Sequence, residues 1–243
     1  FALARGLGRA ARAAGAALHE GTRVRRLHPG PPWRVETGDG TVTAERVMLA
    51  CNGYLDGLHG PSADHVLPIN NYIAVTEPLG DRAPMPEPLA VTDPRFVVNY
   101  WWQTEDGRLV YGGGESYGRR FPRDIAGRVR AQMARIYPDL AGVRLTHAWG
   151  GTLAITASRL PFVREAAPGL MVAGGYSGQG VALSLATGRA FARALAGDRR
   201  ELDLLAALPV PRLPGGRLLG PAITTLGLIG AGLTDRLADL RRR

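Results

Sequence analysis

The residues of this chain with the clearest potential for chemistry form a glycine-rich turn, Gly174-Gly175-Tyr176-Ser177-Gly178-Gln179-Gly180-Val181. An apolar run, residues 170–173, precedes the turn, and an apolar segment of helical length, residues 182–196, follows it. This order predicts a strand, a tight loop and a helix. The first amides of a helix lack intrahelical partners and carry partial positive charge, so they attract an electron-rich or anionic group. Close packing of a buried helix explains the same pattern, and both interpretations stay open here.

A second candidate site follows another apolar run, residues 46–51, which predicts a buried strand. Cys51, Asn52 and Gly53 stand where this strand ends in a turn of small residues. A cofactor can approach an α/β sheet at the carboxyl end of a strand. We therefore expect these three residues to lie beside a bound group.

Four aromatic residues, Trp101, Trp102, Tyr111 and Trp149, are candidates for the wall of a substrate pocket. Alternation along a strand sends roughly half of such side chains to each face. Packing in the core of a sheet explains each of them equally well.

Other site chemistries have less support. The five histidines are dispersed without metal-ligand spacing, and a single cysteine excludes a disulfide framework or a multi-cysteine metal site. Gly6-Leu7-Gly8-Arg9-Ala10-Ala11 matches the G-x-G-x-x-A form of the dinucleotide fingerprint. Only five residues precede Gly6, which is too few for the strand that the fingerprint requires. We interpret these glycines as small packing positions on a helix.

The elements that must position these residues alternate between helices and strands. Helices are predicted over 1–17, 122–137 and 182–196, and strands over 18–27, 33–37, 41–43, 46–51, 71–76, 96–103, 108–112, 143–149 and 170–173. Residues 38–40, Gly-Asp-Gly, predict a hairpin turn between two of these strands.

Composition limits the function classes. The chain has 243 residues, 45% of them hydrophobic and 21% charged, which is ordinary for a globular protein. The net charge of +9 comes entirely from arginines scattered along the chain, so we expect no nucleic-acid partner. The longest apolar stretch, residues 218–233, contains a proline and is too short to span a membrane. No signal peptide is evident, and a cytoplasmic location is the default expectation.

Several short motifs follow one another along the chain. They are Ala50-Cys51-Asn52-Gly53-Tyr54, Leu67-Pro68-Ile69, Thr76-Glu77-Pro78-Leu79, Asp106-Gly107-Arg108-Leu109-Val110-Tyr111-Gly112-Gly113, Trp149-Gly150-Gly151, Arg159-Leu160-Pro161 and the turn at 174–181. In this order they resemble the C-terminal portion of FAD-dependent amine and amino-acid oxidoreductases of the D-amino-acid-oxidase superfamily, in particular the γ-glutamylputrescine oxidase type. The resemblance covers nearly the whole chain.

The resemblance implies a mixed α/β fold in four segments. Residues 1–66 and 153–208 would form part of a FAD-binding domain of the glutathione-reductase-like type, around a mixed-sheet substrate-binding domain, 67–152. Residues 209–243 would form a C-terminal helical tail.

The resemblance also implies a cofactor and a reaction. FAD would be held non-covalently by Cys51, Asn52, Gly53, Gly151, Gly174, Gly175, Tyr176, Ser177, Gly178, Gln179, Gly180 and Val181. The reaction would oxidise a C–N bond of an amine by hydride transfer to the flavin, with oxygen or another acceptor reoxidising it. No side chain is assigned a catalytic role, and no metal is expected.

Two departures from the family pattern matter. The strand, G-x-G-x-x-G turn and acidic residue that hold the dinucleotide in the family are not found in this sequence, so an inactive remnant or interaction module that does not bind FAD is the alternative. The motif Trp149-Gly150-Gly151 carries no arginine of the kind that clamps a substrate carboxylate, which favours an amine over a small α-amino acid.

Overall fold

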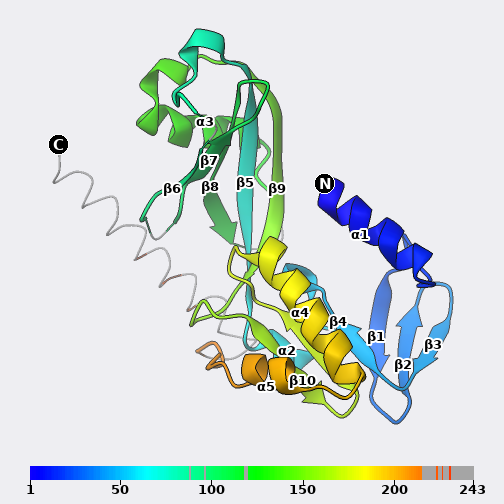
Figure 1. The fold of residues 1–243 in the computed structure, drawn as a ribbon. Helices are drawn as coiled ribbons and strands as arrows, with labels where there is room; N and C mark the ends of the chain where they lie inside the picture. The colour runs from blue at the N-terminus through cyan, green and yellow to red at the C-terminus, as the bar shows by residue number, and fades with distance from the viewer. Residues whose placement is uncertain are drawn as a thin grey trace. The chain divides into compact units, whose positions relative to one another are not determined.

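A computed structural model describes residues 1–87, 89–95, 97–117 and 120–214, together with 223, 226 and 230. The described chain is a mixture of helices and β-sheets, which confirms the predicted mixed α/β class (Figure 1). It divides into two compact units, Phe1–Val47 and Met48–Arg243. Within the described residues, no helix combines the length and the apolar character that crossing a membrane requires.

The first unit contains a helix and a three-stranded antiparallel sheet. Its elements are α1 (Ala2–Ala13), β1 (Val24–His28), β2 (Trp33–Thr37) and β3 (Thr41–Ala44), and the sheet order is β1-β2-β3. The predicted hairpin is confirmed, with Trp33 opposite Ala44 and the Thr37 amide bonded to the Gly40 carbonyl at 2.8 Å. Gly6 and Gly8 lie inside α1, as the helical interpretation of the fingerprint match requires. The predicted strand over 18–27 is wrong at its start, because residues 18–23 form a turn and coil before β1.

A small sheet in the second unit joins segments that are far apart in the sequence. Its strand order is β10 (Phe162–Ala167), β11 (Leu170–Gly174) and β4 (Val47–Leu49). Helices α4 (Gly180–Leu195) and α5 (Arg200–Ala206) follow β11, and their buried Phe191 and Leu202 pack on Val163, Met171 and Ala173 of the sheet. The short elements η1 (Asn52–Tyr54) and α2 (Gly60–Ala63) follow β4. The predicted order of strand, glycine-rich loop and helix is therefore confirmed.

A five-stranded sheet forms the rest of this unit. Its order is β6 (Ala90–Thr92), β7 (Tyr100–Gln103), β8 (Arg108–Tyr117), β5 (Leu67–Pro78) and β9 (Leu145–Ile155). All four pairings are antiparallel, instead of the mixture of directions expected from the resemblance. Strands β5, β8 and β9 are longer than predicted, which places more polar residues on the sheet than the apolar runs alone suggested.

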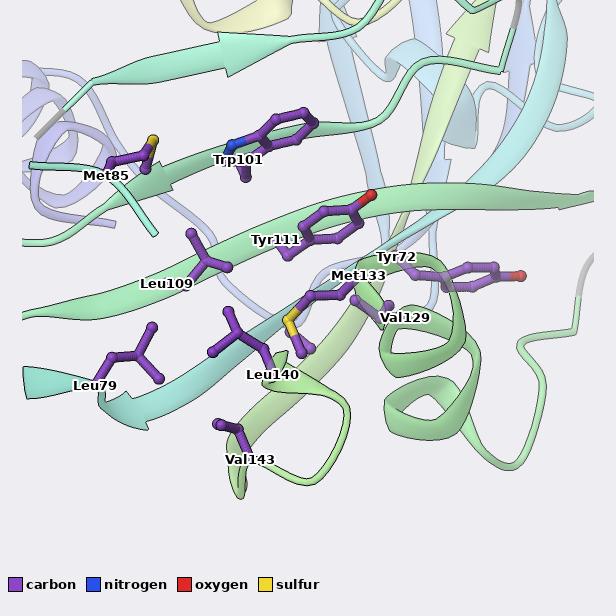
Figure 2. Packing of buried hydrophobic residues seen from close by; sticks show 11 residues of the cluster. Tyr72, Leu79, Met85, Trp101, Leu109, Tyr111, Val129, Met133, Leu140 and Val143 are labelled. Atoms are coloured by element: carbon purple, nitrogen blue, oxygen red, sulfur yellow. The ribbon is translucent and has the colours of Figure 1, made fainter. Parts of the chain in front are cut away.

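One face of this sheet is covered by α3 (Ile125–Ile136), with the short elements η2 (Gly80–Arg82) and η3 (Pro138–Leu140) nearby. The predicted helix over 122–137 is confirmed, and it begins where Asp124 accepts a hydrogen bond from the Gly127 amide at 2.7 Å. Val129 and Met133 of α3 pack on Leu109, Tyr111 and other side chains of the sheet, as Figure 2 shows. This core occupies one face of the sheet and leaves the other face for a site.

The division of the chain into four domain segments stays a prediction. The C-terminal segment, 209–243, lies mostly outside the described residues.

Candidate functional site

A cleft of about 440 Å³ lies where the five-stranded sheet meets the glycine-rich loop. This volume is within the range of about 300–1,000 Å³ that is typical of small-molecule sites. Its polar lining comes from Asn71, Tyr100, Glu115, Arg159 and Gln179, and Ser177 and Gly178 belong to the loop. The remaining described lining is mostly apolar: Ile69, Thr92, Val97, Val98, Leu153 and Ile155.

Strand register explains why these residues share one face of the sheet. Asn71 of β5 lies opposite Glu115 of β8 on one side and Gly151 of β9 on the other. Directly paired residues point to the same face of a sheet. Gly151, although it is not itself a lining residue, therefore points to the same face as Leu153, two positions along β9.

A β-bulge turns Glu115 onto this face. The pairing with β5 shifts by one residue between Asn71 and Ile73, which lie opposite Glu115 and Gly112. Gly114, inside the bulge, has a backbone φ of +75°, a conformation that favours glycine. Without the extra residue, Glu115 would share the face of Tyr111, which is in the core. Bulges commonly re-aim side chains next to functional sites.

Hydrogen bonds fix the middle of the cleft wall. The Tyr100 hydroxyl donates to Asn71 Oδ1 at 2.7 Å, and Asn71 Nδ2 donates to the Gly114 carbonyl at 2.9 Å. The Tyr100 ring lies directly over Gly112, where an added Cβ would fall 2.2 Å from the ring. The Asn71 side chain is therefore held between β7 and the bulge of β8.

Glu115 is the acidic residue of the cleft wall. Its Oε1 accepts a hydrogen bond from the Tyr117 hydroxyl. Burial raises the pKa of the Glu115 carboxyl, and the bond from Tyr117 and the charge of Arg159 oppose that rise. Arg159, at the same cleft, has an unusual backbone φ of +61°.

The glycine-rich loop is fixed by hydrogen bonds at Ser177 and has open space at Gly178. The Ser177 amide donates to the Ala154 carbonyl at 3.0 Å, and the Ser177 hydroxyl accepts from the Thr156 amide at 3.3 Å. At Gly178 (φ +97°) no described residue other than the two chain neighbours has an atom within 4 Å of the position of an added Cβ. No acceptor in the described part of the chain binds the amides of Gly180, Val181 and Ala182 at the start of α4. These amides are available to an electron-rich group.

Other residues predicted to bind the cofactor have structural roles. Asn52 Oδ1 accepts from the Gly175 amide at 3.2 Å, which ties the end of β4 to the loop after β11. An added Cβ at Gly53 would lie 2.7 Å from the Thr152 carbonyl oxygen, so this glycine allows η1 to approach β9. The buried Gly174 packs against the backbone of Asn52. The side chain of Tyr176 is buried, and this burial raises the pKa of its hydroxyl.

Cys51 is half-buried next to this connection. Burial, with a smaller effect of Asp56, raises the pKa of the Cys51 thiol. The neighbouring cavity, lined by Cys51, Asn52, Phe162 and other residues, has a volume of only about 10 Å³. That space accommodates no more than about one water molecule.

The four aromatic candidates separate between the two faces. Trp101 and Tyr111 belong to the core, where their rings stack with centroids 5.6 Å apart (Figure 2), so assigning them to a pocket is wrong. Trp102 and Trp149 are 37% and 46% exposed, but neither is among the described residues that line the cleft. By strand alternation Trp149 points to the same face as Gly151 and Leu153.

Sequence reasoning missed Asn71, Tyr100, Glu115 and Arg159 as site residues. A lone glutamate after three glycines in an apolar strand was a usable signal for one of them. Arg159 stood in a recognised motif without an assigned role. Among the described residues, no group of three or more His, Cys, Asp or Glu side chains is arranged to hold a metal ion.

Comparison with protein families gives one match over most of the chain. The family described as FAD dependent oxidoreductase (DAO) matches residues 1–194. The probable oxidoreductase OrdL of Rhizobium meliloti is 45% identical over 233 residues, 95% of this chain and 54% of the relative. The gamma-glutamylputrescine oxidoreductase of Escherichia coli is 34% identical over 239 residues, 97% of this chain and 56% of the relative. The chain thus spans about half the length of the curated relatives it matches.

Solved structures give the same fold. Glycine oxidase from Geobacillus kaustophilus superposes with a TM-score of 0.69 at 25% identity, covering 86% of this chain and 57% of that protein. L-proline dehydrogenase from P. horikoshii superposes with a TM-score of 0.63 at 22% identity, covering 79% and 54% of the two chains.

Proposed function

The chain belongs to the family of FAD-dependent oxidoreductases, and from this premise we propose that it serves the oxidation of a C–N bond in an amine or amino-acid derivative. The observation that carries the proposal is the joining of two features in one cleft. The glycine-rich loop, with unpaired amides at the start of α4 beside it, forms one side, and a partly polar sheet face forms the other.

The residues of the loop fit a flat aromatic cofactor. The Cβ positions of Gly178 and Gly151 are open, because apart from their chain neighbours no described residue has an atom within 4 Å of either position. The amides of Gly180 and Val181 have no acceptor within the described residues. A helix N-terminus stabilises nearby negative charge by about 0.3–2 kcal/mol, which suits a flavin that becomes more anionic on reduction.

The predicted residues divide by role in this proposal. Ser177, Gly178, Gln179, Gly180, Val181 and Gly151 would contact the cofactor. Asn52, Gly53, Gly174 and Gly175 would hold the strand ends in place, and Cys51 and Tyr176 would pack beneath them. The raised pKa of Cys51 leaves its thiol protonated and poorly nucleophilic, which supports non-covalent binding.

When bound, FAD supplies the two-electron oxidation of the carbon next to the amine nitrogen. The chain's own contribution is to bind and orient. Ile69, Leu153 and Ile155 would help to exclude water from around a bound substrate. Tyr100 and Asn71, which are joined by a hydrogen bond, would form a fixed polar wall against which the substrate is placed. The imine that results would be hydrolysed, and oxygen or another acceptor would take the electrons.

The names of the relatives indicate only the general class of substrate. Those names refer to γ-glutamylputrescine, glycine and L-proline, all of which carry an amine nitrogen. We propose a small-molecule amine as the substrate.

A matched pair of glycine variants tests cofactor binding. Gly151→Val adds a side chain on the face that adjoins the cleft, at a position with no atom of a described residue within 4 Å apart from the chain neighbours. Gly142→Val makes the same change in an exposed turn that is also open. We expect Gly151→Val to weaken FAD binding at least tenfold, measured by quenching of flavin fluorescence, and Gly142→Val to leave it unchanged.

Activity is tested on the same preparation. Anaerobic addition of γ-glutamylputrescine, glycine or L-proline should bleach the bound flavin with at least one of these compounds. A colourless protein that takes up no FAD would favour the alternative of a remnant or interaction module without catalysis.

A further inference from the structure

Glu115 supplies the only carboxylate among the described residues that line the cleft. It reaches the cleft because the bulge at Gly114 turns it away from the core, as strand pairing with Asn71 requires. The φ of +75° at Gly114 is a conformation that L side chains rarely adopt. The backbone is thus arranged so that a charged group faces the cleft.

Two other polar residues that line the cleft, Asn71 of the sheet and Ser177 of the loop, already have hydrogen-bond partners. Asn71 uses both ends of its amide, toward Tyr100 and the Gly114 carbonyl. The Ser177 hydroxyl binds the Thr156 amide and the Gly175 carbonyl.

Glu115 retains hydrogen-bonding capacity. Its Oε1 accepts from Tyr117, and no hydrogen bond to its Oε2 is found within the part of the chain that the structure describes. An ionised carboxylate offers about four acceptor sites and no donor. A ligand that binds there must therefore donate hydrogen bonds, and a cation does so most strongly.

The surroundings favour an aliphatic cation. Ile69, Val98 and Leu153 contribute apolar surface to the same cleft, which suits a chain of methylene groups. Burial raises the pKa of the Glu115 carboxyl, while the hydrogen bond from Tyr117, on the same strand, and the positive charge of Arg159 oppose that rise.

We propose that Glu115 binds an ammonium group of the substrate and makes the cleft selective for aliphatic amines that carry a positive charge. That the bound cation is a substrate rests on the proposed function. The cation site itself depends only on the residues of the sheet wall. Tyr117 acts as a positioning residue for the carboxylate.

The test compares three probes of equal chain length, butylammonium, butan-1-ol and butanoate. Their binding to the full chain without added flavin is measured by ligand-observed NMR at pH 7. The variants are Glu115→Gln and, as a matched control, Glu105→Gln, which makes the same change at an exposed turn of the same sheet. Because hydrogen bonds to charged groups contribute about 1.5–3 kcal/mol, Glu115→Gln should weaken butylammonium binding about 10- to 150-fold. Butan-1-ol binding and the control variant should be unaffected.

Three results would overturn the inference: no binding of butylammonium to the unmodified chain, equal binding to Glu115→Gln, or butanoate bound as tightly as butylammonium. Flavin binding is measured separately on the same proteins. Loss of FAD binding together with Glu115-dependent cation binding would remove the proposed function and keep the cation site. If the protein binds FAD and the Glu115→Gln variant binds the cation as tightly as the unmodified chain, the proposed function would stand and the cation site would be removed.

Discussion

Removing one hydroxyl group at Tyr111 should stabilise the protein, while the same change at Tyr100 should destabilise it. The two tyrosines lie on neighbouring strands, β8 and β7, and face opposite sides of the sheet. Tyr111→Phe and Tyr100→Phe keep both aromatic rings, so the stacking of Tyr111 on Trp101 is preserved. Only the hydroxyl and its environment differ between the two experiments.

The expected magnitudes follow from the partners of each hydroxyl. Tyr111 is completely buried, and its hydroxyl has no hydrogen-bond partner among the described residues. An unsatisfied buried polar group costs about 1–3 kcal/mol, so Tyr111→Phe should raise the free energy of unfolding by an amount in that range. The Tyr100 hydroxyl donates to Asn71 Oδ1 at 2.7 Å. Losing that bond should lower the free energy of unfolding by about 0.5–1.5 kcal/mol.

Urea unfolding at pH 7, followed by tryptophan fluorescence, measures both changes. The midpoint should shift in opposite directions for the two variants while the slope stays the same. A loss of stability in Tyr111→Phe would refute the reasoning, because it would show that the hydroxyl has a favourable partner. It would also reopen a ligand-binding role for this residue.

Alkaline pH gives an independent check on Tyr111. Burial, with a smaller effect of Asp93, raises the pKa of Tyr111 above its usual value of about 10. The unfolded chain therefore loses this proton first, and the free energy of unfolding declines as the pH rises above about 10, because the folded state resists ionisation of the buried phenol. The decline should be smaller in Tyr111→Phe, with the remainder coming from Tyr117 and other buried tyrosines.

Two further predictions concern the site. Asn52→Ala removes the bond to the Gly175 amide and should lower the free energy of unfolding, measured by urea titration, by about 0.5–1.5 kcal/mol. Asn52→Asp keeps an acceptor at this position and should lower the free energy of unfolding by less. Equal losses in the two variants would show that the bond contributes nothing to stability. Glu115→Gln should raise stability at pH 7, because burial raises the pKa of Glu115 and its ionised form costs stability as the pH rises above the unfolded value of about 4.3. Among the described residues, the groups near Glu115 are Tyr117, Arg159 and Tyr100, and they are unchanged in this variant. The gain should therefore disappear near pH 4, and a gain that persists there would contradict the assignment.

Local patterns in the sequence were sufficient for several elements. The apolar run, glycine-rich turn and apolar segment around 170–196 became β11, the loop and α4, because each signal is contained in a few neighbouring residues. The helical spacing of Ile125, Val129 and Met133 and the turn at 38–40 were sufficient for the same reason. The ordered motifs were sufficient for the family, which the match over residues 1–194 shows.

Only the tertiary structure decided which face of each strand becomes a site. Alternation separates Tyr100 from Trp101, but it cannot say which of them meets α3, because that depends on pairing between residues distant in the chain. The bulge at Gly114 then reverses the alternation, so that Glu115 leaves the core face where a regular strand would put it. A shift of one residue in strand register moves a side chain from one face to the other, and register is set by contacts between strands that no local pattern contains.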